Sequence, residues 1–577
     1  MFREDYLGKP LTGVSIYRPH VRGTGGAVSS NNPYVSSAAL QILKKGGNAA
    51  DAAAAASLVL GVVEPFNSGI GGGAFSLCYQ SDTKKFCAYN GRGEAPRRAW
   101  TDMFLGEDGQ PDPELTEFSG RSTAAPALYR VIGRLLSEQG TMTLKEVSEP
   151  AINLARNGFY AGFLYQSASS TNNAMYCAEH YEGFTDLYWT DGKPRTYGDF
   201  VKNPELADTM EQVAENGIDW FYQGPIAKEM VEAVQKHKGV LEMEDLAGCR
   251  AKDLDVVKGT YRGHDIISVA PPSSGGAHII QALNILQNFD LRSMGFLSAD
   301  SIHVIAETMK IMFADRSIAM GDPEFVDVQL DKIIDPAYAK ELAQKIDMNR
   351  AQNYMPDPSL AAQDHNGCTT HFSVQDKDGN IVCQTQTIRN WWGCGVVIPG
   401  RGFVMNNAMA DFSAKAGVRT SQGLAYGTAN AVQPKKVPLS SMCPTIVLKD
   451  SKPLLSVGAA GGPRIITATL QLILNVIDYE MMMDVAVRAP HICCLSQDQG
   501  LELEAGVSPD SVQILRNRGH KALDYPSHAI LKELSNGILK LGEYYYPGGT
   551  SRAEGGGGIL TGDNKICIDG FCFENCM

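Results

Sequence analysis

The stretch Gly367-Cys368-Thr369-Thr370-His371-Phe372-Ser373-Val374-Gln375-Asp376-Lys377-Asp378-Gly379-Asn380 decides how this chain is interpreted. Apolar and polar residues alternate along its middle, which predicts a β-strand. The run Ile381-Val382-Cys383-Gln384-Thr385-Gln386-Thr387 comes after the turn and predicts a second strand. A three-residue loop with Gly379 in the left-handed conformation would place Thr369 opposite Thr387 on one face of the hairpin.

The bulk composition predicts a globular protein with a large core. The chain has 577 residues, of which 44% are hydrophobic and 20% charged, and its length suits either several domains or one large interleaved unit. The net charge of −13 argues against a nucleic-acid partner, because phosphate binding needs a basic surface. The longest apolar run, residues 49–63, contains Asp51 and is shorter than the roughly 20 residues of a membrane span. We therefore expect no membrane partner.

The N-terminus and the cysteines bear on the compartment and on cofactors. No secretory signal follows the charged N-terminus, so we expect a cytoplasmic location. Thirteen cysteines are an odd number without C-x-x-C pairs, which makes a disulfide framework unlikely and indicates a reducing compartment. A metal site at Cys567, Cys572 and Cys576 is the less favoured alternative, because their spacing matches no common zinc pattern. The glycine-rich stretch 67–74 lacks the ending of a phosphate loop, so no cofactor is predicted.

Two helices have distinctive patterns. Residues 49–63 are so rich in Ala, Leu and Val that we expect a helix buried on nearly all sides. In residues 298–316, Ile302, Ile305, Met309 and Met312 recur at three- and four-residue spacing. This spacing predicts a surface helix with one face in the core.

Residues 368–374 and 376–380 together resemble the processing site of the γ-glutamyltransferase (glutathione hydrolase) family of N-terminal-nucleophile hydrolases. In that family the chain cuts itself before the first threonine, which here is Thr369. The resemblance implies an α+β fold, a four-layer αββα sandwich. It also implies a large subunit, residues 1–368, and a small subunit, residues 369–577, which interleave in one globular unit as a heterodimer of cleavage fragments.

The catalytic mechanism that the resemblance implies has a clear physical basis. A threonine hydroxyl is a poor nucleophile until a base takes its proton, and cleavage before Thr369 would free an α-amine with a pKa of about 7.7–8.0 as that base. The acyl-enzyme forms through an oxyanion that needs preorganised N–H donors. The pair Gly461-Gly462 can present two such groups at a strand-to-helix junction, and the matching pair in the family forms the oxyanion hole.

Further matches define a substrate pocket by resemblance. Arg92 stands where the family's arginine grips the α-carboxylate of the γ-glutamyl group, a task that suits a guanidinium. Asp411 matches the aspartate that holds the α-ammonium. Ser440 and Ser441 match the substrate-binding serine pair, and Thr387 matches the second threonine, whose hydroxyl touches the nucleophile.

Three positions depart from the family pattern. Arg389 stands in place of an asparagine that helps bind the substrate's amino group, and Ala408 replaces a glutamine in the same pocket. A cation near an ammonium is unfavourable unless Asp411 or Glu94 offsets it. Gln422 stands where the family's lid loop carries an aromatic residue.

The expected activity is transfer or hydrolysis of a γ-glutamyl group through an ester on Thr369. The partners would be a small γ-glutamyl donor, glutathione being typical of the family, and water, an amino acid or a peptide as acceptor. Arg389 and Ala408 favour one rival, an acylase acting on an oxamate-type or cephalosporin-type amide. The other rival is an unprocessed, non-catalytic homologue.

Overall fold

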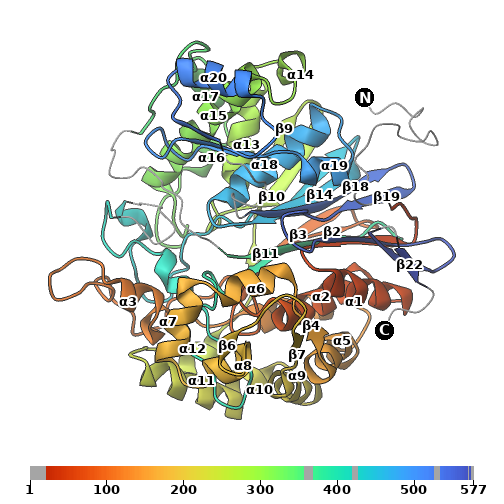
Figure 1. The fold of residues 1–577 in the computed structure, drawn as a ribbon, viewed down its shortest axis with the longest axis vertical. Helices are drawn as coiled ribbons and strands as arrows, with labels where there is room; N and C mark the ends of the chain where they lie inside the picture. The colour runs from red at the N-terminus through yellow and green to blue at the C-terminus, as the bar shows by residue number, and fades with distance from the viewer. Residues whose placement is uncertain (1–20, 356–367, 419–426, 525–532, 570, 574–577) are drawn as a thin grey trace.

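The computed structural model describes residues 21–355, 368–418, 427–524, 533–569 and 571–573. Two β-sheets are stacked face to face between two layers of helices (Figure 1), so the predicted α+β, four-layer αββα sandwich is confirmed. The first sheet has nine strands in the order β22 (Phe571–Phe573), β21 (Ile566–Ile568), β20 (Gly556–Leu560), β1 (Gly26–Ser30), β11 (Thr370–Asp376), β12 (Ile381–Thr387), β2 (Gly73–Gln80), β3 (Lys85–Gly91) and β8 (Lys252–Leu254). The second has six, in the order β19 (Tyr544–Gly548), β18 (Leu534–Leu541), β14 (Lys452–Ala460), β13 (Thr445–Lys449), β10 (His264–Val269) and β9 (Val256–Tyr261).

The predicted hairpin is the centre of the nine-stranded sheet. Strands β11 and β12 pair antiparallel with Thr370 opposite Gln386, which is the register that a three-residue loop predicts. Gly379 has a φ of 88° and its N–H donates to the carbonyl of Asp376. The register therefore brings the start of β11 next to the end of β12, where Thr369 and Thr387 lie.

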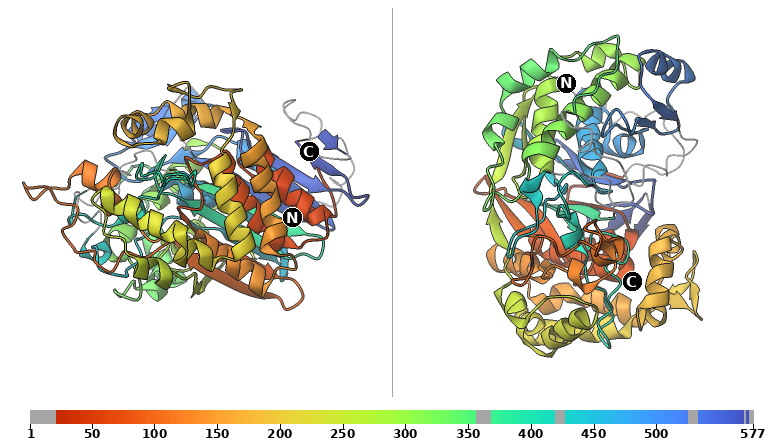
Figure 2. Two further views of the ribbon diagram at one scale, coloured as in Figure 1. Left: turned by 90° about the horizontal axis from the view of Figure 1, so that it is seen from below. Right: turned by 90° about the vertical axis from the view of Figure 1, so that its left-hand side faces the viewer.

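Helices cover the outer faces of both sheets. Figure 1 shows α1, α2 and α5 on one side of the stack and α13, α15 and α18 on the other, and the right-hand view of Figure 2 shows the same layering from the side. The helices named here are α1 (Pro33–Lys44), α2 (Ala49–Val63), α5 (Leu144–Asn157), α13 (Gly275–Leu286), α15 (Ala299–Ala319), α18 (Arg464–Ile477) and α20 (Pro509–Asn517). Every residue of α2 is buried, as its composition predicts.

Helix α15 differs from its prediction as a surface helix. His303, Glu307 and Lys310 are buried together with the apolar residues of the helix. The buried charges are paired internally, because the Lys310 ammonium lies 2.6 Å from Glu307 and also donates to the carbonyl of Gln352 and to the side chain of Gln497. Polar residues can be buried when they are paired. The polar residues of α15 therefore do not place one face of this helix in solvent.

Both sheets contain strands from before and from after residue 368. In the first sheet, β1 pairs on one side with β11 and on the other with β20. In the second, β10 pairs with β13. The two predicted subunits thus share both sheets, although the cut between them stays a prediction.

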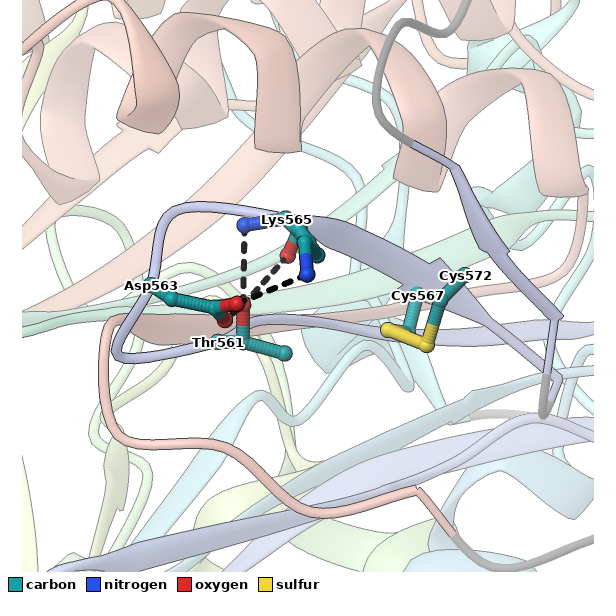
Figure 3. The surroundings of a disulfide bond; sticks show 5 residues. All are labelled: Thr561, Asp563, Lys565, Cys567 and Cys572. Atoms are coloured by element: carbon teal, nitrogen blue, oxygen red, sulfur yellow. Dashed lines mark hydrogen bonds and ion pairs between the residues drawn. A yellow bond between two sulfur atoms is a disulfide. The ribbon is translucent and has the colours of Figure 1, made fainter.

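The C-terminal strands contain a disulfide. Cys567 and Cys572 are bonded across the β21–β22 hairpin (Figure 3), whereas the other ten cysteines of the described residues are free, so this single disulfide is not part of a framework. Because each sulfur is bonded to the other, the metal alternative for these two cysteines is excluded, and Cys576 lies outside the described residues.

Among the described helices, none has the length and apolar character of a membrane span.

Candidate functional site

The two threonine hydroxyls meet at the carbonyl of Cys368. Thr369 Oγ1 donates to the Cys368 carbonyl oxygen and lies 3.2 Å from Thr387 Oγ1. Thr387 Oγ1 lies 3.1 Å from the same carbonyl oxygen and accepts from the N–H of Arg389 at 2.8 Å. The candidate nucleophile therefore lies against the bond that it would cut, and a second hydroxyl is directed at the oxygen that would become negative.

The turn after α2 holds the residue that precedes the nucleophile. The Phe66 carbonyl lies 3.7 Å from the Cys368 sulfur and accepts from the N–H of Trp392, while the Arg389 carbonyl, at 3.0 Å, is the nearer acceptor for the Cys368 thiol. The neighbouring Asn67 carbonyl accepts from the N–H of Ile388. A Cβ atom on Gly72 would collide with the carbonyl oxygen of Thr387, so the glycine lets this segment lie against β12.

Gly461 and Gly462 lie between β14 and α18, as predicted. Their φ angles are 125° and 60°, a region that residues with a Cβ rarely adopt. Gly462 lines the same pocket as Thr369 and Thr387. The helix that follows is buried along most of its length, which fixes the position of its N-terminal end. The geometry is compatible with an oxyanion site beside the nucleophile.

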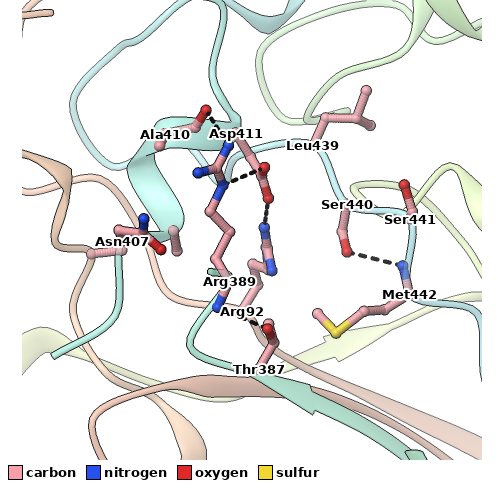
Figure 4. A network of polar contacts seen from close by, with 12 residues as sticks. Arg92, Thr387, Arg389, Asn407, Ala410, Asp411, Leu439, Ser440, Ser441 and Met442 are labelled. Atoms are coloured by element: carbon pink, nitrogen blue, oxygen red, sulfur yellow. Dashed lines mark hydrogen bonds and ion pairs between the residues drawn. The ribbon is translucent and has the colours of Figure 1, made fainter. Parts of the chain in front are cut away.

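Arg92, Arg389 and Asp411 form one buried network (Figure 4). The Asp411 carboxylate accepts from Arg389 Nε at 2.8 Å through one oxygen and from Arg92 Nη2 through the other. Arg389 Nη2 also donates to the Ala410 carbonyl at 3.1 Å. Asp411 therefore offsets the charge of Arg389, and both of its carboxylate oxygens accept hydrogen bonds from arginines.

Glu117 is a part of this network that the sequence did not reveal. Its carboxylate accepts from Arg389 Nη1 at 2.5 Å and from the side chain of Asn390. Although burial opposes a charge, the carboxylates of Glu117 and Asp411 outweigh it and raise the pKa of Arg389. Glu94, the other carboxylate that the sequence analysis considered for offsetting Arg389, instead pairs with Lys252 at 2.9 Å.

Ser440 and Ser441 complete the pocket on a separate loop (Figure 4). Both are largely buried, and the pocket brings them together with Arg92, Asp411 and Thr369. Eight of the nine predicted site residues thus line one pocket, and the ninth, Gly461, directly precedes Gly462 in the chain. Ala408 is buried in a neighbouring apolar cluster, and Gln422 lies outside the described residues.

Two buried titratable groups lie near the nucleophile strand. Burial raises the pKa of Glu64 to about 7, and its Oε2 accepts from Asn67 at 3.0 Å. Burial lowers the pKa of His371 to about 3, so the ring is neutral. Its nitrogens contact the hydroxyls of Thr385 and Ser373, so it is not placed as the base for Thr369.

A histidine–glutamate cluster lies elsewhere, between α15 and the segment after α20. His303 Nδ1 is 2.8 Å from His520 Nε2, and Glu307 is close to both. The ammonium of Lys310 already neutralises Glu307 in this buried place. A divalent cation would add uncompensated positive charge, so the cluster fits a hydrogen-bond network better than a metal site.

Comparisons with known proteins agree with this geometry. A profile of the gamma-glutamyltranspeptidase family matches residues 35–555. The chain is 41% identical over 507 residues to the glutathione hydrolase proenzyme of Escherichia coli K12, covering 88% of this chain and 87% of that protein. It is 35% identical over 510 residues to the acylase ACY 1 proenzyme of Pseudomonas sp. SE83, covering 87% of this chain and 88% of that protein.

A solved structure supports the fold independently. The cephalosporin acylase from Bacillus halodurans matches with a TM-score of 0.83 and 24% identity, over 95% of this chain and 98% of that one. The predicted N-terminal-nucleophile hydrolase architecture is therefore confirmed. Because the family profile spans most of the sequence and the Escherichia coli relative is 41% identical across it, the chain belongs to the γ-glutamyltranspeptidase family.

Proposed function

We propose that this protein is a γ-glutamyl hydrolase and transferase that matures by cutting its own Cys368–Thr369 bond. The observation that carries the proposal is the contact of Thr369 Oγ1 with the Cys368 carbonyl, with Thr387 at the same oxygen. Attack by the hydroxyl would convert the amide to an ester, and water would open that ester. The products would be residues 1–368 and 369–577, held together as a heterodimer.

The freed α-amine would then serve as the base. It takes the proton of the Thr369 hydroxyl as the oxygen bonds to the γ-carbonyl carbon of the donor, and it passes this proton to the departing amine as the C–N bond breaks. Gly461 and Gly462 would stabilise the oxyanion through their N–H groups. Water or an amino-acid or peptide amine would open the ester. Activity should rise with pH through the amine pKa, about 7.7–8.0.

The donor would be held through its charges. Arg92, with Ser440 and Ser441, would bind the α-carboxylate, because a guanidinium and two hydroxyls are suited to an anion. Asp411 would bind the α-ammonium in competition with its two arginines. The cytoplasmic location stays a prediction.

A second candidate activity is favoured by the two arginines that bind the Asp411 carboxylate. With both carboxylate oxygens held by Arg92 and Arg389, the pocket suits an acyl group that has a carboxylate but no ammonium. The alternative activity is therefore an acylase acting on a dicarboxylic monoamide.

One set of assays separates these candidates. We expect p-nitroaniline release from γ-glutamyl-p-nitroanilide to exceed release from glutaryl-p-nitroanilide, which lacks the ammonium. A reversed preference would favour the acylase. No release from either, together with one intact chain by mass spectrometry, would indicate the non-catalytic homologue.

A further inference from the structure

Arg316 lines the proposed donor pocket, although the sequence did not single it out. It lies near the C-terminal end of α15, is 2% exposed, and borders the same space as Arg92, Ser440 and Ser441. Its Nε donates to Ser274 Oγ at 2.8 Å, and its Nη2 donates to Ser441 Oγ at 3.1 Å. A residue far along the chain thus contacts Ser441, one member of the serine pair, directly.

These contacts determine what the serine hydroxyls can do. A hydroxyl has one proton to donate, and here the oxygen of Ser441 accepts from a fixed cationic donor. Its own proton is then available for an acceptor in the pocket. The oxygen of Ser440 is engaged in the same way by the N–H of Met442 at 3.1 Å, as Figure 4 shows. The pair is therefore arranged to donate two O–H bonds to an anion.

The loop itself does not depend on Arg316 alone. The Ser440 carbonyl accepts from both the N–H and the hydroxyl of Ser274, and the Met442 carbonyl accepts from Ser273 Oγ. The N–H of Ser440 donates to the carbonyl of Pro272. These bonds tie the turn at residues 271–274 to the serine loop without the guanidinium, so removing Arg316 leaves most of the connection in place.

We propose that Arg316 is a positioning residue that directs the Ser441 hydroxyl toward the carboxylate of the acyl donor. A charge-assisted hydrogen bond to the serine oxygen also polarises its O–H bond and makes it a stronger donor. Arg316 thereby favours acyl donors that carry a carboxylate next to Ser441. The inference rests on the proposed function, because it assumes that the acyl donor occupies this pocket.

The test compares two anilides that differ in one group. γ-Glutamyl-p-nitroanilide has the α-carboxylate, and 4-aminobutanoyl-p-nitroanilide lacks it. Arg316→Gln should lower kcat/KM for the first by about 10- to 100-fold, mainly through KM, and for the second by less than about threefold. Arg316→Lys, which keeps the charge, should give an intermediate loss. An equal loss with both anilides would mean a structural role and overturn the proposal.

Two controls sharpen this result. In a Ser441→Ala background, Arg316→Gln should have little further effect on the preference between the anilides, because the hydroxyl it positions is gone. Arg262→Gln removes a remote ion pair to Asp478 and should leave the preference unchanged. Mass spectrometry of each variant confirms that the chain has been cut before its kinetics are compared.

A binding measurement distinguishes failure of this inference from failure of the proposed function. If the wild type does not release p-nitroaniline from the γ-glutamyl anilide, the proposed function is wrong. Calorimetric titration with glutarate still tests Arg316, because this ligand has carboxylates and no ammonium. Weaker binding to Arg316→Gln, by about tenfold or more, supports the positioning role, and unchanged binding contradicts it.

Discussion

The nucleophile end of the hairpin and the charged pocket beside it are built in different ways. At the hairpin, Thr369 and Thr387 are placed by strand pairing, so their positions follow from local register. In the pocket, Arg92, Arg389 and Asp411 come from separate loops and meet through ion pairs. The bond-forming part therefore depends on the backbone, whereas donor selection depends on side chains that can be exchanged.

The backbone of Arg389 joins these two regions. Its N–H donates to Thr387 and its carbonyl accepts from the N–H of Cys368, while its side chain belongs to the pocket. Its φ of 83° lies in the left-handed region, which asparagine tolerates better than arginine. A substitution of the Arg389 side chain should therefore change the pocket and leave the backbone contacts with Thr387 and Cys368 in place.

Removing the nucleophile should have the largest effect. Thr369→Ala should stay as one full-length chain and lose activity by at least about 10³-fold, because both the hydroxyl and the freed amine are absent. Mass spectrometry and the γ-glutamyl anilide assay check this. Thr369→Ser retains a hydroxyl and should still be cut, more slowly. A cut and active Thr369→Ala would refute the proposed chemistry.

Removing the second hydroxyl should slow maturation. Thr387→Ala removes the hydrogen bond to the Cys368 carbonyl, so self-cleavage should slow by about 10- to 100-fold. The rate is measured by following the two fragments after purification of the precursor. Thr387→Ser keeps the hydroxyl and serves as the matched control. If alanine and serine variants mature equally fast, this hydroxyl has no part in the cut.

Changing Arg389 should alter selectivity and leave bond formation intact. Arg389→Asn frees one oxygen of Asp411 and suits the positive φ, so the kcat/KM ratio of γ-glutamyl to glutaryl anilide should rise about tenfold. Because Glu117 would lose its partner, the double variant Arg389→Asn with Glu117→Gln is tested alongside. An unchanged ratio in both variants would show that Arg389 does not control ammonium binding.

The smallest effect concerns the buried carboxyl of Glu64. Burial raises the pKa of Glu64 from 4.5 to about 7. Between these two pH values the carboxyl keeps its proton in the folded state and has lost it in the unfolded chain. This group's contribution to stability therefore falls as pH rises from about 4.5 to about 7, by at most about 3 kcal/mol. Glu64→Gln should melt a few degrees higher than wild type at pH 8 and nearly alike at pH 4.5. Equal melting temperatures at both values would contradict the assignment.

The hairpin and the buried helix α2 could be predicted because their signals are local. Alternation with a period of two and a glycine turn specified the register, and uniform apolar composition specified burial. The family resemblance supplied the pocket residues, and the structure brings Arg92, Asp411, Ser440 and Ser441 together as expected.

Residues whose role depends on a distant partner could not be predicted. Glu117 contacts Arg389, which follows it by 272 positions, and Arg316 contacts Ser441, which follows it by 125. No short-range period reports such pairs. The burial of helix α15 depends partly on such pairs, because Lys310 donates to Gln352 and Gln497, which follow it by 42 and 187 positions.

Strand β1 has a consequence for how the protein can be synthesised. Its neighbours are β11 and β20, so residues 26–30 pair with a segment that emerges from the ribosome more than 500 positions later. The nine-stranded sheet cannot close until residues 556–560 have been synthesised, and such non-local pairing folds slowly. The proposed self-cleavage would therefore follow synthesis of β20, and a gene truncated before β20 would leave the N-terminal strand with an open edge prone to aggregation.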